Sequence, residues 1–130
     1  MTQTSEQPSR APSAVDAVAD QYLATYCRLN PFAATSMGVP GYDHLATDLS
    51  PAGLDAMASA ARYALAELAT GHAVDDVDRV TMAAMQERLG LEVELHEANE
   101  WLGQLNNIAS HVQELRDIFD IMPTSTPEHW

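Results

Sequence analysis

One long segment with helical periodicity, residues 75–110, constrains the fold more than any other part of the sequence. Apolar residues recur in it at spacings of three, four or seven, which places them on one side of a helix. They are Val80, Ala84, Leu91, Leu95, Ala98, Leu102 and Leu105. A second apolar stripe beside the first consists of Met82, Met85, Leu89 and Val93. Because so wide an arc is typical of a helix with several neighbours, we predict a long central helix near residues 76–105.

Two shorter helical segments are predicted at the start of the chain. Ser13, with Asp16 three residues later, resembles a capping box, and apolar spacings of three and four continue a helix over residues 13–29. Pro31 disfavours helical backbone at Asn30 and therefore ends this helix. Asn30 can in turn cap a short helical turn over residues 31–37, with Pro31 at its first position.

Two more helices flank the central one. Residues 38–45 contain two glycines and a proline within four positions and read as a loop. Residues 50–51, Ser-Pro, start an alanine-rich helix that ends at Gly71. After the central helix, Ser110 can cap a last helix, which Pro123 ends.

The fold class predicted from these signals is all-α, a helical bundle or hairpin of about four helices. No segment alternates apolar and polar residues as a half-buried strand does, and no hairpin turn lies between apolar runs. A chain of 130 residues has the length of about one domain. Residues 1–12, rich in Ser, Thr, Gln and Pro, predict a disordered lead-in, which leaves 13–130 as a single helical domain.

The charge of the chain argues against several classes of partner. Its net charge is -13 and its isoelectric point is near 4.4. Six arginines and no lysine cannot readily form the basic face that nucleic acid or an anionic membrane requires. No apolar run has the length of a membrane span and the N-terminus has no signal-like apolar region, so we expect a cytoplasmic protein; an exported protein without its leader would have the same features. The single cysteine, Cys27, excludes an internal disulfide, and its helical apolar setting predicts a buried residue.

Residues 96–100, His-Glu-Ala-Asn-Glu, are the nearest approach to a catalytic motif. Zinc peptidases carry His-Glu-x-x-His on a helix, with both histidines facing one metal and the Glu polarising a bound water. Here Glu100 replaces the second histidine, and His96 with Glu100 gives only two ligands. We therefore interpret this segment as a polar turn that faces solvent.

Other metal-ligating residues are scattered. Asp43, His44 and Asp48 fall close together in the predicted loop, where such residues usually make turns and caps. A small metal-binding bundle would need His96 and Glu100 together with His44 or His111. Without a convincing set, we predict no catalytic, cofactor-binding or metal-binding residue in this chain.

The C-terminal residues carry a helix start. Thr126 is a suitable cap, Pro127 fits the first helical position and an acid follows. A start signal at this place predicts that the polypeptide is the N-terminal portion of a longer protein.

The order of short segments in this chain resembles the start of the bacterial domain-of-unknown-function 885 family, over about residues 14–130. The matching pieces are Tyr22, residues 29–35, Gly38, residues 42–45, residues 48–51, residues 105–106, residues 108–110 and residues 126–130. The resemblance implies a largely helical protein several times longer, similar to zinc-dependent peptidases of the gluzincin type, whose His-Glu-x-x-His helix lies far beyond this region. The chain departs from the family in residues 38–42, where members often carry His-Glu before Tyr-Asp.

Two functions from different classes follow. The first is an N-terminal helical scaffold segment of a metallopeptidase-like protein, not catalytic by itself, with zinc expected only in full-length relatives. The alternative is a free-standing acidic helical module for protein–protein interaction or dimerisation, with Met82 and Met85 on its docking surface. The partner is accordingly the remainder of a longer chain, or else a protein partner or a second copy bound through the apolar helix face. Neither reading involves nucleic acid or a membrane.

Overall fold

The computed structural model describes residues 10–103, 107–108 and 110–127, and within these ranges it contains helices and no strand. The all-α class is therefore confirmed, with five α-helices where about four were predicted. The elements are α1 (Ala14–Leu29), α2 (Pro31–Ser36), α3 (Pro51–Thr70), α4 (Asp76–Glu97), one turn of 3-10 helix (Glu100–Gly103) and α5 (His111–Ile121). None of the described helices is both long enough and apolar enough to cross a membrane.

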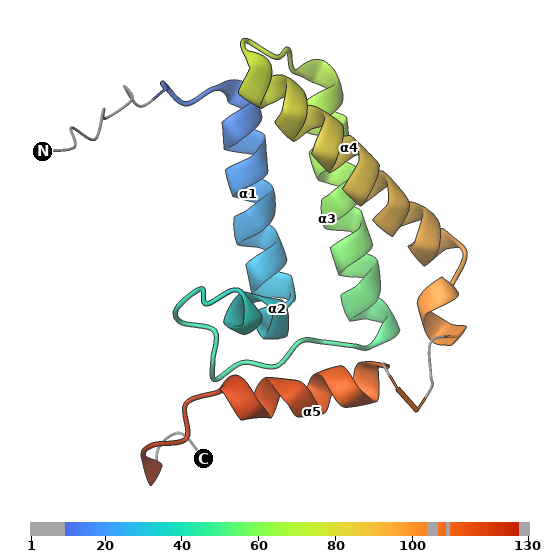
Figure 1. Cartoon of the computed structure of the whole chain (residues 1–130). Coiled ribbons are helices and arrows are strands. Elements are labelled where there is room, and N and C mark those ends of the chain that lie inside the picture. The colour runs from blue at the N-terminus through green and yellow to red at the C-terminus, as the bar shows by residue number, and fades with distance from the viewer. Residues whose placement is uncertain (1–9, 104–106, 109, 128–130) are drawn as a thin grey trace, which may run out of the picture.

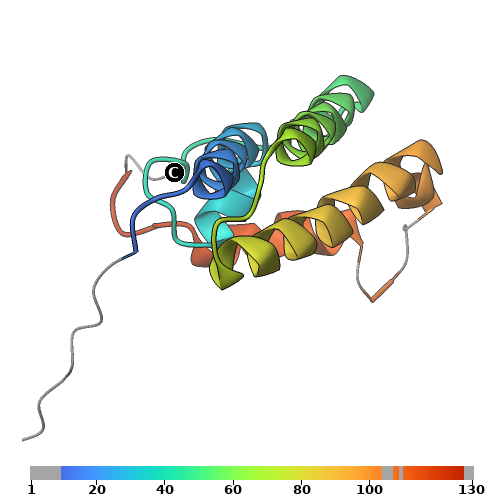
Figure 2. The same ribbon diagram turned by 90° about the horizontal axis from the view of Figure 1, so that it is seen from above.

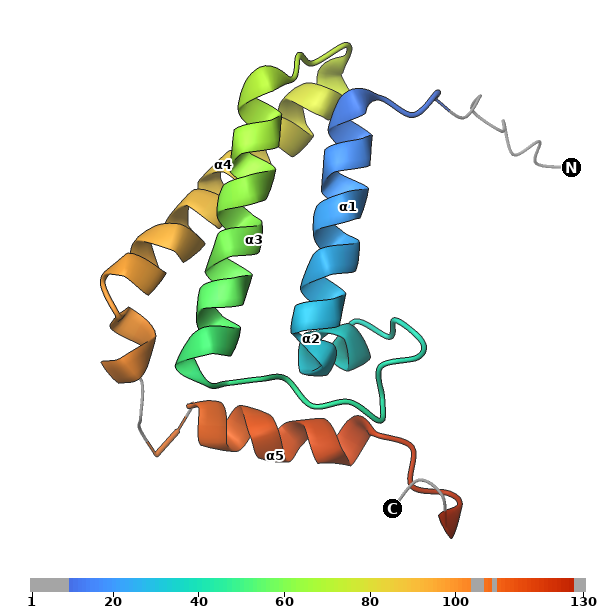
Figure 3. The same ribbon diagram turned by 180° about the vertical axis from the view of Figure 1, so that it is seen from behind.

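The helices α1 and α3 stand side by side, and α4 crosses one face of the pair (Figure 1). From behind, the opposite face of α1 and α3 is not covered by another described helix (Figure 3). The view from above shows α4 on a single side of the pair (Figure 2). The last helix, α5, runs across the end of the bundle and packs against the short α2.

Local capping explains where the helices begin. The Ser13 side chain accepts a hydrogen bond from Asp16 N, and the Asp16 carboxylate accepts one from Ser13 N, which completes the predicted capping box. Ser50 caps α3 by accepting from the backbone of Gly53. Asn30 caps α2 through its Oδ1 atom, which accepts from Ala33 N at 3.2 Å. These starts lie within a residue of the positions that the sequence predicts.

The central helix is shorter than predicted, because it ends at Glu97 and not near residue 105. Asn99 has a φ of 53°, in the left-handed region, which Asn tolerates better than most residues. Its N–H donates to the carbonyl of His96, and the 3-10 turn follows in a new direction. Residues 104–106, at the end that the sequence predicts for this helix, lie outside the described residues.

The two apolar stripes of α4, which the sequence combines in one wide arc, differ in burial. The second stripe packs inward: Leu89 is buried against Ala61 and Ala64 of α3, with Met85 and Val93 beside it. The first stripe faces solvent along most of its described length; Val80 is 69% exposed and Leu91 45%, while the side chains of Leu102 and Leu105 are not described. Because α3 presents alanines here, long side chains are needed opposite them to fill the interface.

A buried ionic cluster joins the start of α1 to the start of α4. Asp78 has no exposed surface, and its carboxylate accepts from Val74 N at 3.0 Å, Ser13 Oγ at 2.7 Å and Arg10 Nη2 at 3.0 Å. Arg10 also pairs with Asp16 at 2.6 Å and Asp75 at 3.2 Å. The Val74 hydrogen bond, with those of Ser13 and Arg10, lowers the pKa of Asp78 despite its burial.

We predict that Asp78→Asn lowers the melting temperature at pH 7 by several degrees. A carboxylate with a lowered folded-state pKa contributes stability above its unfolded pKa, about 3.9, and loses it as the pH falls through the folded value. The difference in melting temperature between wild type and Asp78→Asn should therefore become smaller below about pH 4. Thermal unfolding by circular dichroism at several pH values measures this. Asp76→Asn is the matched control, since Asp76 is exposed in the same helical turn; an equal effect of both variants would contradict the assignment.

Two helical glycines should respond oppositely to alanine. A methyl group at Gly90, inside α4, meets open space, so Gly90→Ala should stabilise the fold by about 0.5–1 kcal/mol through helix propensity. A methyl group at Gly53 would collide with the backbone carbonyl of Asp48, so Gly53→Ala should cost about 1–3 kcal/mol. Urea unfolding compares the two variants. A gain of stability at Gly53 would show that the loop before α3 adjusts freely.

Candidate functional site

The second half of α4 diverges from α1 and α3, and a cavity of about 250 Å³ lies where the three helices separate. Residues from the end of α1, the first half of α3 and the last turns of α4 form its walls. They are Tyr26, Asn30, Leu54, Met57, Ala58, Glu92, Leu95 and His96. Half of these side chains are apolar, and the polar ones come from α1 and α4.

Glu92 is the carboxylate of this cavity. Its side chain is partly buried, and its Oε2 atom accepts a hydrogen bond from the Tyr22 hydroxyl at 3.3 Å. Burial raises the pKa of Glu92, and the Tyr22 hydroxyl and the nearby His96 offset only part of that effect. Burial and the Glu92 charge also raise the pKa of Tyr22 well above its usual range, so its hydroxyl stays protonated and donates.

His96 lies one helical turn after Glu92 and bonds across to α3. Its Nε2 atom is 2.9 Å from Oδ1 of Asp55, and which of the two donates depends on the imidazole tautomer. The His96 side chain is mostly buried while that of Asp55 is exposed. This pair ties the last turn of α4 to the first turns of α3 at the rim of the cavity.

The two tyrosines of α1 extend the polar lining. The rings of Tyr22 and Tyr26 stack with centroids 6.0 Å apart. The Tyr26 hydroxyl accepts from Nδ2 of Asn30 at 3.2 Å. Thr47, which is buried in the loop before α3, donates from Oγ1 to Oδ1 of Asn30 at 2.8 Å and accepts from Phe32 N at 3.1 Å. One wall of the cavity is thus held by hydrogen bonds that link α1, α2 and the loop.

The structure separates the metal-binding candidates of the sequence. Glu100 lies beyond the reversal at Asn99 and is exposed, whereas His96 turns toward Asp55. His44 is exposed in the loop, and the side chain of His111 is not described. Asp48 accepts from Ser50 N at 2.9 Å, which is a turn-making role. Among the described residues, no three His, Cys, Asp or Glu side chains are grouped so as to hold a metal ion.

The cysteine and loop predictions correspond to the structure in detail. Cys27 is buried and unpaired in α1, as its apolar setting indicated. In the loop, Gly38 and Gly41 have φ values of 73° and 93°, which side chains with a Cβ atom rarely adopt.

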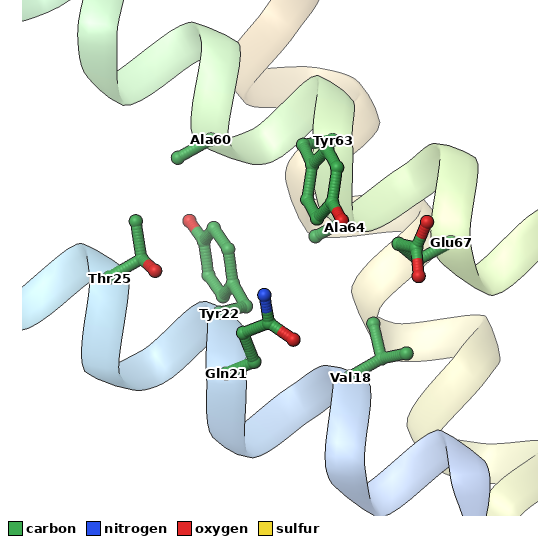
Figure 4. A pocket seen from close by; sticks show the side chains of 8 residues that line it. All are labelled: Val18, Gln21, Tyr22, Thr25, Ala60, Tyr63, Ala64 and Glu67. Carbon is green, nitrogen blue, oxygen red and sulfur yellow. The ribbon is translucent and has the colours of Figure 1, made fainter.

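A second, smaller cavity of about 130 Å³ lies between α1 and α3 (Figure 4). The rings of Tyr22 and Tyr63 stand at the gap between the helices, and Glu67 is the one charged side chain among the lining residues. The other residues of the lining are Val18, Gln21, Thr25, Ala60 and Ala64. This cavity has little of the polar chemistry of the first.

Glu92, Asp55 and Tyr22 were not predicted from the sequence as members of one site. A usable signal was present, since Glu92 and His96 are four residues apart and so share a helix face. Their partners on α1 and α3 are distant in sequence, and no local pattern connects them.

We predict that Glu92→Gln raises the melting temperature at pH 7 by a few degrees. A carboxyl group with a raised folded-state pKa adds stability below its unfolded pKa and loses it as the pH rises through the folded value. The charged wild type is therefore penalised at pH 7, and the difference should vanish below about pH 4. Calorimetry at both pH values tests this, with the exposed Glu94→Gln as control. A large loss of stability in Glu92→Gln would mean that the ionised carboxylate is stabilising.

Comparison with known proteins agrees with the resemblance seen in the sequence. A family model described as "Bacterial protein of unknown function (DUF885)" matches residues 31–130. No curated protein matches the chain.

Proposed function

Since the chain belongs to the bacterial family of unknown function DUF885, we propose that it is a helical scaffold segment of a longer, metallopeptidase-like protein. In this proposal the helices form one wall of a larger helical assembly and carry no catalytic group of their own. Any zinc chemistry then belongs to other parts of the longer protein.

The outward face of α4 is the observation that carries this proposal. Val77, Val80 and Leu91 are all exposed, and their spacing places them on one face of the helix. Glu87 and Arg88 interrupt the stripe at its middle. Leaving such side chains in water forfeits about 25 cal/mol for each Å² of apolar surface that a neighbour would cover. An apolar face of this kind is typical of an interaction surface.

A second uncovered surface supports the same proposal. Val112 and Phe119 lie seven residues apart on α5, which places them on one face of that helix. Phe119 is 62% exposed, whereas Ile118 is buried. Two helices of the described part of the chain thus present apolar groups outward. Further helices packed there would cover both.

The alternative function, an acidic module that binds a partner or dimerises, uses the same surface. Of its expected Met82/Met85 docking pair, Met85 packs against the core of Ala61, Ala64 and Leu89, and Met82 is partly buried. A partner would therefore contact the outward stripe of α4. The two readings differ in what covers that stripe: further helices of one chain, or a second protein.

We predict that the 130-residue chain alone binds a hydrophobic dye and self-associates without a defined stoichiometry. Val80→Asp should reduce dye binding and association at least about twofold, since Val80 is exposed and the charge opposes burial. Gln86→Asp, an exposed change on another face of α4, is the control and should have little effect. Analytical ultracentrifugation decides the outcome. A cooperatively melting monomer contradicts the scaffold proposal, and a discrete dimer that Val80→Asp dissociates favours the alternative.

The encoding DNA gives an independent test. The scaffold proposal expects the reading frame to continue beyond the Trp130 codon into a region that encodes a His-Glu-x-x-His helix. A stop codon, with no such helix in any frame, would overturn it and leave the interaction module.

A further inference from the structure

We propose that the cavity between α1, α3 and α4 binds an organic cation, a guanidinium or ammonium group on a short aliphatic stem. This proposal goes beyond the scaffold function and does not depend on it. It rests on the geometry of the cavity walls and on the placement of charged groups around them.

The cavity contains a carboxylate, and the one basic side chain in its lining is His96, which offsets only part of the effect of burial on the pKa of Glu92. Glu92 lies in its wall, and among the described residues its carboxylate has one hydrogen-bond partner, the Tyr22 hydroxyl. Asp55 adds a second carboxylate at the rim, next to His96. No arginine is among the residues that line the cavity. Arg62 of α3 pairs with Glu97 of α4 at 3.2 Å, on the surface and not in the cavity lining.

A bound cation would compensate the Glu92 carboxylate for the hydration that it loses in the cavity. A partly buried carboxylate loses hydration that one hydroxyl donor does not replace. A guanidinium or ammonium group supplies charge-assisted hydrogen bonds, which are about twice as strong as neutral ones. The raised pKa of Glu92 agrees with this, because a compensating positive charge would lower the pKa.

The remaining walls suit an aliphatic stem. Leu54, Met57 and Ala58 of α3 face Leu95 of α4 across the cavity. A volume of about 250 Å³ is below that of typical drug-sized sites and accommodates one side chain or one small amine. Tyr26 and Asn30 already bond to each other, so they leave the charged end of the ligand to Glu92.

The test uses n-butylguanidinium as the probe and n-butylurea as its neutral counterpart. It compares two variants, Glu92→Gln and Glu94→Gln, each of which removes one negative charge. In ¹H–¹⁵N NMR titrations at pH 7, n-butylguanidinium should shift the amides around Glu92. Glu92→Gln should weaken binding about tenfold or more. Glu94→Gln, exposed on the same helix, should change it less than about twofold. Equal weakening in both variants, or equal binding of n-butylurea, overturns the proposal.

The pH dependence gives a second readout. The titratable groups next to Glu92 are Tyr22 and Tyr26 from α1 and His96 on α4 itself, and Asp55 from α3 bonds to His96. Binding should weaken as the pH falls through the raised pKa of Glu92, and this step should be absent in Glu92→Gln. A pH profile that is the same in both proteins would assign the binding to other carboxylates and overturn the proposal.

A peptide arm identifies the source of the cation. A capped Ala-Arg-Ala peptide that binds tighter than n-butylguanidinium indicates an arginine from a polypeptide, and the reverse indicates a free small amine. Neither result depends on the exposed stripe of α4. The cation-binding proposal can therefore fail while the scaffold proposal holds, and the reverse is also possible.

Discussion

The hydrogen bonds and ion pair of Asp78 fix the end of the bundle from which the other helices are placed. One carboxylate with no exposed surface joins the start of α1, the link before α4 and the guanidinium of Arg10. An ion in such a place destabilises the fold unless its lone pairs are used, and here three donors use them. The cluster therefore specifies one relative position of α1 and α4, which a purely apolar contact between small residues would leave less defined.

The splay of α4 follows from this constraint. The helix is held at its first turn by Asp78 and along its middle by Leu89, which packs against Ala61 and Ala64. Beyond Leu89, Val93 still packs against this core, but Glu92 and His96 place polar groups between the helices, where Glu92 accepts from Tyr22 and His96 bonds to Asp55. We attribute the separation of the helices at this end, and the cavity between them, to that change of polarity. The His96–Asp55 hydrogen bond limits how far the last turn of α4 can move away.

The parts of this fold that could be read from the sequence are those in which cause and effect are close along the chain. Ser13, Asn30 and Ser50 cap helices through donors three residues away, so their roles are visible in a short window. Which of the two apolar stripes of α4 is buried could not be read in this way, because it depends on the alanines of α3, which are distant in the sequence. The same is true of the pairing of Glu92 with Tyr22, which are far apart in the chain. The end of α4 at Asn99 was missed for another reason: Asn occurs in both helices and left-handed turns, and the periodicity of the apolar residues continued past it.

The distribution of the arginines bears on both proposals. Four of the six arginines pair with carboxylates in the described part of the chain: Arg10 in the Asp78 cluster, Arg62 with Glu97, Arg79 with Asp76, and Arg88 with Glu87. A net charge of -13 therefore leaves most acids without an internal counter-charge. The resulting field favours the approach of cations over the whole surface, but at the cavity a partly buried carboxylate also lies beside apolar walls that would hold an aliphatic stem. The outward face of α4, by contrast, offers apolar groups flanked by charge and is suited to a helix. The chain thus presents two surfaces with different requirements: the cavity favours a cation with an aliphatic stem, and the outward face of α4 favours an apolar neighbour.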